Sequence, residues 1–256
     1  MTQAPPDDTQ VPLPSIGGLD AEQLQHRLKE FTRMMMTYDF AISEVTTKME
    51  ILQAEFEHLH EYNPIENINS RLKSAESVLE KMRRRGVDFS MEAISEHITD
   101  IAGVRIICSF ISDAYRILEM FTHQGDVTVL TVKDYISNPK GNGYRSLHAI
   151  VQVPVFLSDR TVPVTVEVQI RTIAQDFWAS LEHKIYYKYS REVPQDLLND
   201  LQQAAERAHE LDKTMESIHK IVSAQPGAKV TTGLQERLLS ALTAGNQLGF
   251  MQDGND

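Results

Sequence analysis

The chain has 256 residues, 41% of them hydrophobic, which suits one substantial domain with appendages, or two small domains. Its formal net charge of −11 at pH 7 argues against a surface that binds duplex nucleic acid, which usually favours a basic domain. The single cysteine, Cys108, excludes an intrachain disulfide and is compatible with a reducing compartment. The N-terminus does not resemble a signal or transit peptide, and no apolar run approaches a membrane span of about 20 residues. We therefore expect a cytoplasmic protein that does not bind membranes.

The two ends of the chain carry long apolar seams. Residues 1–18 contain four prolines and few large apolar groups, which predicts a disordered tail. Apolar residues then recur at spacings of four and three from Leu24 to Leu59, which predicts one long helix, or two in near continuity, ending before Asn63-Pro64. A second seam from Leu197 to Val222 predicts another long helix.

We expect one main domain over residues 19–224 and a tail over residues 225–256, with a short helix around residues 234–242. Between the seams, helices are predicted at residues 75–85, 113–121 and 172–189, and strands at residues 101–108, 127–132, 147–153 and 162–170. Because helices and strands mix without regular βαβ alternation, we expect an α/β (α+β) core with a mixed sheet.

The last predicted strand alternates strictly between apolar and polar residues. Val164, Val166, Val168 and Ile170 point one way, and Thr165, Glu167, Gln169 and Arg171 point the other. One face of this strand is therefore core, and the other carries a carboxylate, an amide and a guanidinium in line. Such a face predicts a functional site.

A glycine-containing cationic loop precedes that strand. Residues 133–148 read K-D-Y-I-S-N-P-K-G-N-G-Y-R-S-L-H, with Lys133, Lys140, Arg145 and His148 around two glycines. Glycine lets the backbone approach a ligand closely, while Lys and Arg neutralise charge, so this pattern favours polyphosphate binding.

A cationic column is predicted on the helix at residues 75–85 and just before it. Lys73, Ser77, Lys81 and Arg85 are spaced by four residues and would share one face. The alternative is a solvated face with salt bridges, as Glu80 and Arg84 would form. The column has no acidic partner at this spacing, which favours phosphate.

Several motifs resemble the RelA/SpoT-type synthetase domain, and in particular the small single-domain alarmone synthetases. They are D-I-A-G-V-R at residues 100–105, the loop above, E-V-Q-I-R-T at residues 167–172, and F-W-A-S-L-E-H at residues 177–183. The resemblance implies a nucleotidyltransferase-like sheet of about five strands flanked by helices. It also implies transfer of pyrophosphate from ATP to the 3′-hydroxyl of GTP or GDP, giving pppGpp or ppGpp. Because no His-Asp dipeptide occurs, we expect no hydrolase activity.

The resemblance also implies residue roles. ATP would be bound by Arg71, Lys73, Ser77, Lys81, Arg105 and Lys133. The guanidinium groups of Arg105 and Arg71 would stack on opposite faces of the adenine. Asp100 and Glu167 would be catalytic and would hold Mg²⁺, which prefers oxygen ligands. Asp100 and Arg105 have opposite strand parity, so both face the site only if the chain bends near Gly103 or the strand begins after Asp100. The alternative role for Asp100 is a cap or turn residue.

GTP or GDP would be bound by Lys140, Tyr144, Arg145, His148, Gln169, Asp176 and Glu182. Tyr144 would be the stacking platform for guanine, although taken alone it would more often be a core aromatic, and His148 alone would more often be structural. Small synthetases more typically carry Asn where this chain has Asp176. Arg171 could equally anchor the following helix, so no role is assigned to it.

Two further questions stay open at this level. The apolar seams either pack within one chain or build a homo-oligomer; we expect an oligomer, with a tetramer favoured over a dimer, because the family often oligomerises. The alternative to a synthetase is a catalytically silent nucleotide-binding regulator of the same fold, but both carboxylates are present. The acidic balance disfavours single-stranded RNA binding as the main role.

Overall fold

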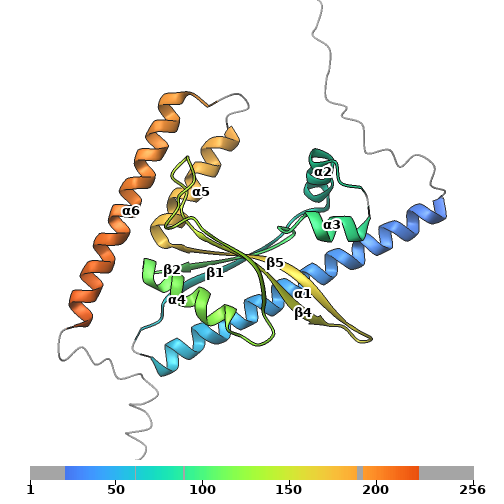
Figure 1. The fold of residues 1–256 in the computed structure, drawn as a ribbon, viewed down its shortest axis with the longest axis horizontal. Helices are drawn as coiled ribbons and strands as arrows, with labels where there is room; N and C mark the ends of the chain where they lie inside the picture. The colour runs from blue at the N-terminus through green and yellow to red at the C-terminus, as the bar shows by residue number, and fades with distance from the viewer. Residues whose placement is uncertain (1–20, 61, 89, 189–192, 225–256) are drawn as a thin grey trace, which may run out of the picture.

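A computed structural model describes residues 21–60, 62–88, 90–188 and 193–224 (Figure 1). The predicted tails at residues 1–18 and 225–256, with the short helix around residues 234–242, lie outside the described residues. Within the described part, no helix is long and apolar enough to cross a membrane.

The centre of the molecule is one mixed sheet of five strands in the order β1-β2-β5-β4-β3. The strands are β1 (Ile65–Leu72), β2 (Ala102–Cys108), β3 (Thr128–Asp134), β4 (Leu147–Phe156) and β5 (Thr161–Thr172). Only β2 and β5 pair in parallel, and the other three pairings are antiparallel. The expected mixed sheet of about five strands is confirmed.

In the part of the chain that the structure describes, six helices accompany the sheet: α1 (Ala21–Leu59), α2 (Ala75–Arg85), α3 (Met91–His97), α4 (Ile111–Thr122), α5 (Ile173–Lys188) and α6 (Gln195–Ser223). Of the two alternatives for the first seam, one continuous helix is correct, and α1 crosses beneath the sheet in Figure 1. The long α6 lies beside α5, at the end of the sheet away from α2 and α3.

The apolar core lies on one face of the sheet, against α1 and α4. Val166, Val168 and Ile170 of β5 are fully buried there, together with Met49 of α1 and Phe121 of α4. Each such side chain contributes about 1.5–3 kcal/mol on full burial. The alternation predicted for β5 is therefore confirmed, and its polar side chains lie on the opposite face of the sheet.

Two elements were not predicted. Strand β1 is an edge strand that pairs only with β2, and most of its side chains are polar and at least partly exposed, so its sequence has no apolar alternation. Helix α3 has seven residues, too few for a clear periodicity, and begins where Ser90 Oγ accepts a hydrogen bond from the Ala93 amide.

The two seams differ in what they contact. The α1 seam packs on the sheet through residues such as Tyr38 and Val45. In α6, by contrast, the predicted seam is largely exposed at Leu211 and Met215, whereas Ala205 and Asp212 are buried. The intrachain contacts of α6 thus use a face rotated slightly from the seam.

Candidate active site

One row of side chains crosses the open face of the sheet from edge to edge. Cα partners in register place Lys133 of β3 beside His148 of β4, then Gln169 of β5, Arg105 of β2 and Asn69 of β1. Cross-strand partners point to the same face of a sheet, so these five side chains share the face opposite the core. Register therefore brings predicted residues from three separate motifs together.

A second row runs beside the first and contains the cleft. Gly103 of β2 pairs with Glu167 of β5 on one side and with Arg71 of β1 on the other. Because Gly103 has no side chain, space remains between these two residues. The cleft has a volume of about 350 Å³ and is lined by Asn69, Ser70, Arg71, Lys73, Asp100, Gly103, Val104, Arg105, Glu167 and Gln169.

Asp100 lies at the end of the turn before β2, so the second explanation of its parity is correct: the strand begins after it. Its Oδ2 accepts contacts from Lys73 Nζ at 3.0 Å and Lys81 Nζ at 2.7 Å. Burial disfavours the charged form, but the hydrogen bonds from Lys81 and Lys73 outweigh it and hold the pKa of Asp100 below its ordinary value. The buried Oδ1 has no hydrogen-bond partner among the described residues.

The predicted cationic column is only partly correct. Lys73 precedes the cap residue Ser74 and is not helical, yet it converges with Lys81 on Asp100. Ser77 is engaged in capping, since its amide donates to Ser74 Oγ at 3.3 Å. Arg85 donates to the backbone carbonyl of His97 in α3 and does not line the cleft.

Glu167 receives a contact on each carboxylate oxygen. His148 Nδ1 lies 3.3 Å from Oε1, and Gln169 Nε2 donates to Oε2 at 3.0 Å. Burial disfavours ionisation, but the hydrogen bonds from His148 and Gln169 outweigh it and keep the pKa of Glu167 below its ordinary value. Glu167 is therefore held as a carboxylate beside Asp100.

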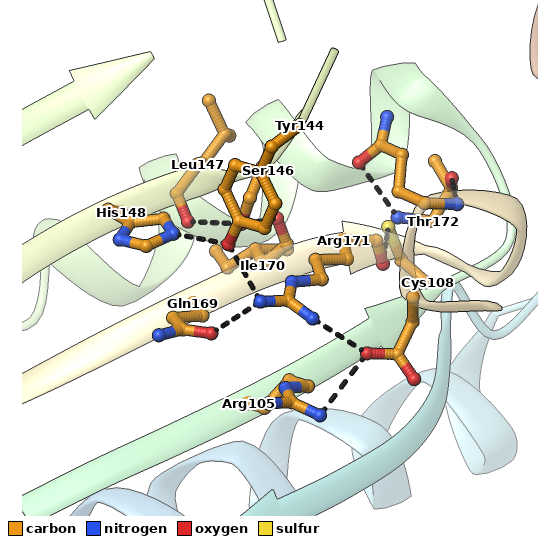
Figure 2. Close-up of polar contacts among 12 residues, drawn as sticks. Arg105, Cys108, Tyr144, Ser146, Leu147, His148, Gln169, Ile170, Arg171 and Thr172 are labelled. Carbon is orange, nitrogen blue, oxygen red and sulfur yellow. Dashed lines mark hydrogen bonds and ion pairs between the residues drawn. The ribbon is translucent and has the colours of Figure 1, made fainter. Parts of the chain in front are cut away.

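Tyr144 joins the loop before β4 to this carboxylate. Its hydroxyl lies 2.7 Å from His148 Nε2 and 2.7 Å from Arg171 Nη2 (Figure 2). Lys140 Nζ lies 4.7 Å from the ring centroid of Tyr144. The ring also packs against the small cluster around Trp178, so Tyr144 is both a packed aromatic and part of the site.

Asp176 contacts two arginines with one oxygen. Its Oδ1 lies 3.0 Å from Arg171 Nη1 and 3.3 Å from Arg105 Nη1. The residue predicted for the guanine side thus contacts Arg105, which is predicted for adenine. Asp176 connects the two halves of the predicted site.

Three other predicted residues lie at or beyond the margin of this site. Arg145 donates to the backbone carbonyl of Ile136 at 2.7 Å and lies 3.3 Å from Glu206 of α6, so it ties the loop to α6. Glu182 accepts a hydrogen bond from Asn142 Nδ2 at 3.1 Å, beside a second hollow of about 240 Å³. Lys133 is exposed on the edge strand β3.

Sequence reasoning assigned no role to two kinds of residue that the structure places here. Asn69 and Ser70 line the cleft from β1, the strand that was missed. Arg171 is only 5% exposed and donates to three side chains of the site. Arg171 lies on the same face of β5 as Glu167 and Gln169, and this alternation in the sequence could have assigned it to the site.

The chain is similar to known proteins over this region and beyond. The family model described as "Region found in RelA / SpoT proteins" matches residues 70–192. GTP pyrophosphokinase YwaC of Bacillus subtilis (strain 168) is 48% identical over 201 residues, which are 78% of this chain and 96% of that protein. GTP pyrophosphokinase YjbM of the same organism is 37% identical over 190 residues, which are 74% and 89% of the two chains.

Solved structures agree with this similarity. Small alarmone synthetase 2 from Bacillus subtilis superimposes with a TM-score of 0.69 at 49% identity, over 75% of this chain and 98% of that one. Small alarmone synthetase 1 from Bacillus subtilis, bound to its product pppGpp, superimposes with a TM-score of 0.70 at 37% identity, over 76% and 98%. A structure of that synthetase bound to AMPCPP gives 0.65 at 34% identity, over 77% and 100%.

Proposed function

The chain belongs to the RelA/SpoT family, and from this premise we propose that its open sheet face is a GTP pyrophosphokinase site that makes pppGpp or ppGpp. The observation that carries the proposal is the cleft itself. It places the carboxylates Asp100 and Glu167 together, with Arg71, Lys73 and Arg105 around them. Two carboxylates among cations suit a reaction between two polyphosphates.

In the proposed reaction, the 3′-oxygen of GTP or GDP attacks the β-phosphorus of ATP. The bond from that phosphorus to the oxygen bridging the α-phosphate breaks, and AMP leaves with the electron pair. The β,γ-pyrophosphate is thereby transferred, and the hydroxyl proton passes to a base. We assign that role to Glu167, because hydrogen bonds from Gln169 and His148 hold it ionised at the margin of the cleft.

We assign the ATP side to the part of the cleft near β1, β2 and α2. Arg105 and Arg71 present guanidinium groups suited to stacking on a purine. Lys73 and Lys81 converge on Asp100 and are placed to meet phosphate oxygens, and Ser77 belongs to the same helix as Lys81. Lys133, which the sequence also assigned to ATP, lies on β3 at the opposite edge of the sheet, next to His148, so it is not adjacent to this side.

We assign the guanine nucleotide to the side near Tyr144. The Tyr144 ring would provide the stacking platform, and His148 links it to Glu167. Four other predicted residues border this side: Lys140, Gln169, Asp176 and Glu182. Because Lys140 is the cation among these four, we expect it to contact the phosphates of the guanine nucleotide. Arg145 would act more indirectly, by holding the loop against α6.

Asp100 and Glu167 would hold Mg²⁺, with Asp100 as the principal ligand. The fit rests on the chemistry of the donors and on the buried Asp100 Oδ1, which has no hydrogen-bond partner in the described part of the chain. When bound, the ion would neutralise the charge that the polyphosphates bring to the cleft.

Incubation of the purified protein with Mg²⁺, labelled ATP and GTP, GDP or GMP tests the proposal. The expected result is a labelled guanine nucleotide with a 3′-pyrophosphate, together with one AMP for each product molecule. Binding of both nucleotides without turnover would decide for the silent regulator instead. A parallel Glu167→Gln sample shows whether any product comes from this site.

We also propose that the protein is a cytoplasmic homo-oligomer, with a tetramer favoured. The support is the apolar surface that the single chain leaves exposed on α5 and α6, including Phe177 at 66% and Leu211 at 55% exposure. Large apolar patches on soluble proteins usually mark contacts with other molecules.

A further inference from the structure

Arg171 can only donate hydrogen bonds, and two chains of hydrogen bonds begin at its guanidinium group. Its Nη2 donates to Tyr144 Oη at 2.7 Å and to Gln169 Oε1 at 2.8 Å. Its Nη1 donates to Asp176 Oδ1 at 3.0 Å. Because a guanidinium has no acceptor, the group that it meets must present an oxygen lone pair. Arg171 therefore determines the direction of every hydrogen bond that follows.

The first chain passes through the Gln169 amide. Since its Oε1 faces Arg171, its NH₂ group faces Glu167 and donates to Oε2 at 3.0 Å. With the amide reversed, the NH₂ would meet another donor and the carbonyl oxygen would meet a carboxylate. Both contacts would be repulsive, so Arg171 excludes the reversed amide.

The second chain passes through Tyr144 and His148. The Tyr144 hydroxyl accepts from Arg171, which leaves its single hydrogen to donate to His148 Nε2 at 2.7 Å. A neutral imidazole that accepts at Nε2 carries its own hydrogen on Nδ1. Nδ1 lies 3.3 Å from Glu167 Oε1.

We infer that Arg171 is a positioning residue that, through Gln169 and through Tyr144 with His148, directs one hydrogen bond to each oxygen of Glu167. The five side chains form a closed ring, and Figure 2 shows the Arg171 guanidinium between Tyr144 and Gln169, with His148 beyond Tyr144. Arg171 does not line the cleft, as expected for a residue that acts through others. The inference rests on the proposed role of Glu167 as the base.

Kinetics of three variants test the inference. Arg171→Gln adds an acceptor where the wild type has only donors, so the direction of the hydrogen bonds to Gln169 and Tyr144 is no longer fixed. We expect kcat to fall by about 10- to 100-fold, the scale of a small misplacement at a reacting group. Arg171→Lys keeps a donor-only group and should recover part of that loss. Tyr144→Phe keeps the ring but removes one chain, and should lower kcat less than Arg171→Gln. KM for both nucleotides should stay within about threefold of wild type in all three.

The matched control is Arg116→Gln on α4, where the guanidinium lies over the Phe56 ring, 4.9 Å from its centroid and away from the cleft. It should leave kcat unchanged. Wild-type kcat in Arg171→Gln, or equal losses in the Lys and Gln variants, would overturn the inference. So would wild-type kcat in Tyr144→Phe.

A measurement independent of turnover separates this inference from the proposed function. Nitrogen-15 NMR at about pH 8, where imidazoles are ordinarily neutral, should find the hydrogen of His148 on Nδ1. Arg171→Gln and Tyr144→Phe should shift it toward Nε2. This tautomer in a protein that makes no product would refute the proposed function alone. Product formation by a protein whose His148 carries its hydrogen on Nε2 would refute the inference alone.

Discussion

Glu167→Gln removes a charge from the polar face of a strand whose other face is buried in the core. The fold should persist, because Val166 and Val168 beside it are unchanged. Synthesis should fall by roughly 10²-fold or more, the usual scale of general-base assistance, while both nucleotides still bind. Single-turnover assays and binding measurements on the same sample check this. Near wild-type turnover would leave the proposed mechanism without its base.

Asp100→Asn should differ from Glu167→Gln in what it does to ATP. It weakens the charge contacts with Lys73 and Lys81 and removes the principal proposed Mg²⁺ ligand. We expect weaker Mg²⁺-dependent ATP binding as well as slower synthesis, measured by ATP titration with and without Mg²⁺. An unchanged Mg²⁺ dependence would contradict the assignment of the ion to Asp100.

The two nucleotides should be separable by mutation. Tyr144→Ala removes a stacking face worth about 1–3 kcal/mol and should weaken GTP far more than ATP. Arg105→Ala should do the reverse. Because Asp176 contacts both Arg105 and Arg171, each variant should also have a small effect on the other nucleotide. Equal losses for both nucleotides in both variants would refute the assignment of sides.

At the residue scale, the alternation of apolar and polar residues predicted which side chains share a face of the sheet. Alternation along residues 164–171 placed Glu167 and Gln169 on the open face, and the parity of Asp100 correctly required a break before Arg105. It could not separate Arg145 from Arg171, because both are cations beside the site. Their roles depend on which acceptors the folded chain brings near them, Glu206 in one case and Gln169 in the other.

The loop before β4 packs closely against α6 at Gly143. This residue has φ of +87°, and a Cβ built on it would lie 2.6 Å from the Ala205 Cβ of α6. Gly143→Ala should therefore cost about 1–2 kcal/mol for the backbone conformation and a further 1–3 kcal/mol for overpacking. We expect a lower unfolding temperature and weaker GTP binding, because Tyr144 is the next residue.

Gly141→Ala is the matched control in the same loop. A Cβ there would meet nothing within 4 Å, and its φ is not in the left-handed region. It should change stability and GTP binding little. The double variant Gly143→Ala with Ala205→Gly should recover the overpacking part only. Equal effects of the two glycine replacements would show that the contact with α6 is unimportant.

At the element scale, periodicity predicted α2 with its bounds correct, and the strands that carry apolar alternation within a few residues. Strand β1 lacks that alternation because an edge strand in this fold buries little, here mainly Ile65. The sequence could not reveal the register between strands, which places Asn69 beside Arg105. That register depends on contacts between segments far apart in the chain.

Stability of the whole molecule should depend on one buried carboxylate in α6. Burial raises the pKa of Asp212 to about 6, and the hydrogen bond that Thr172 Oγ1 donates to Oδ2 at 2.7 Å only partly offsets it. The folded state therefore binds a proton more tightly than the unfolded chain. The charged form costs stability above pH 6, and that cost disappears as the pH falls toward the ordinary range of Asp near 4.

Asp212→Asn should accordingly be more stable than wild type at pH 8, by on the order of 1–2 kcal/mol, and this advantage should shrink below pH 6. Urea unfolding of both proteins at pH 8 and pH 5 measures it. Asp200→Asn, on an exposed position of the same helix, is the control. An advantage that is the same at both pH values would contradict the burial of a charge at Asp212.

The exposed seam of α6 predicts assembly. Light scattering at micromolar concentration should give an oligomer, most simply a tetramer. Met215→Glu places a charge on the seam and should lower the mass, whereas Lys213→Glu, also exposed on α6, should not. A fully active monomer would show that the seam does not mediate assembly.

The single parallel pairing in the sheet has a kinetic consequence. Asp100 lies next to β2 and Glu167 on β5, strands that are far apart in the chain and pair directly. Such non-local pairings form late, because closing a long loop costs entropy before any contact compensates for it. Either half of the sheet folded alone would hold one carboxylate without the other. During synthesis of the chain, the proposed pyrophosphate transfer therefore cannot begin until β5 has emerged and docked. A partly synthesised chain would make no pppGpp or ppGpp.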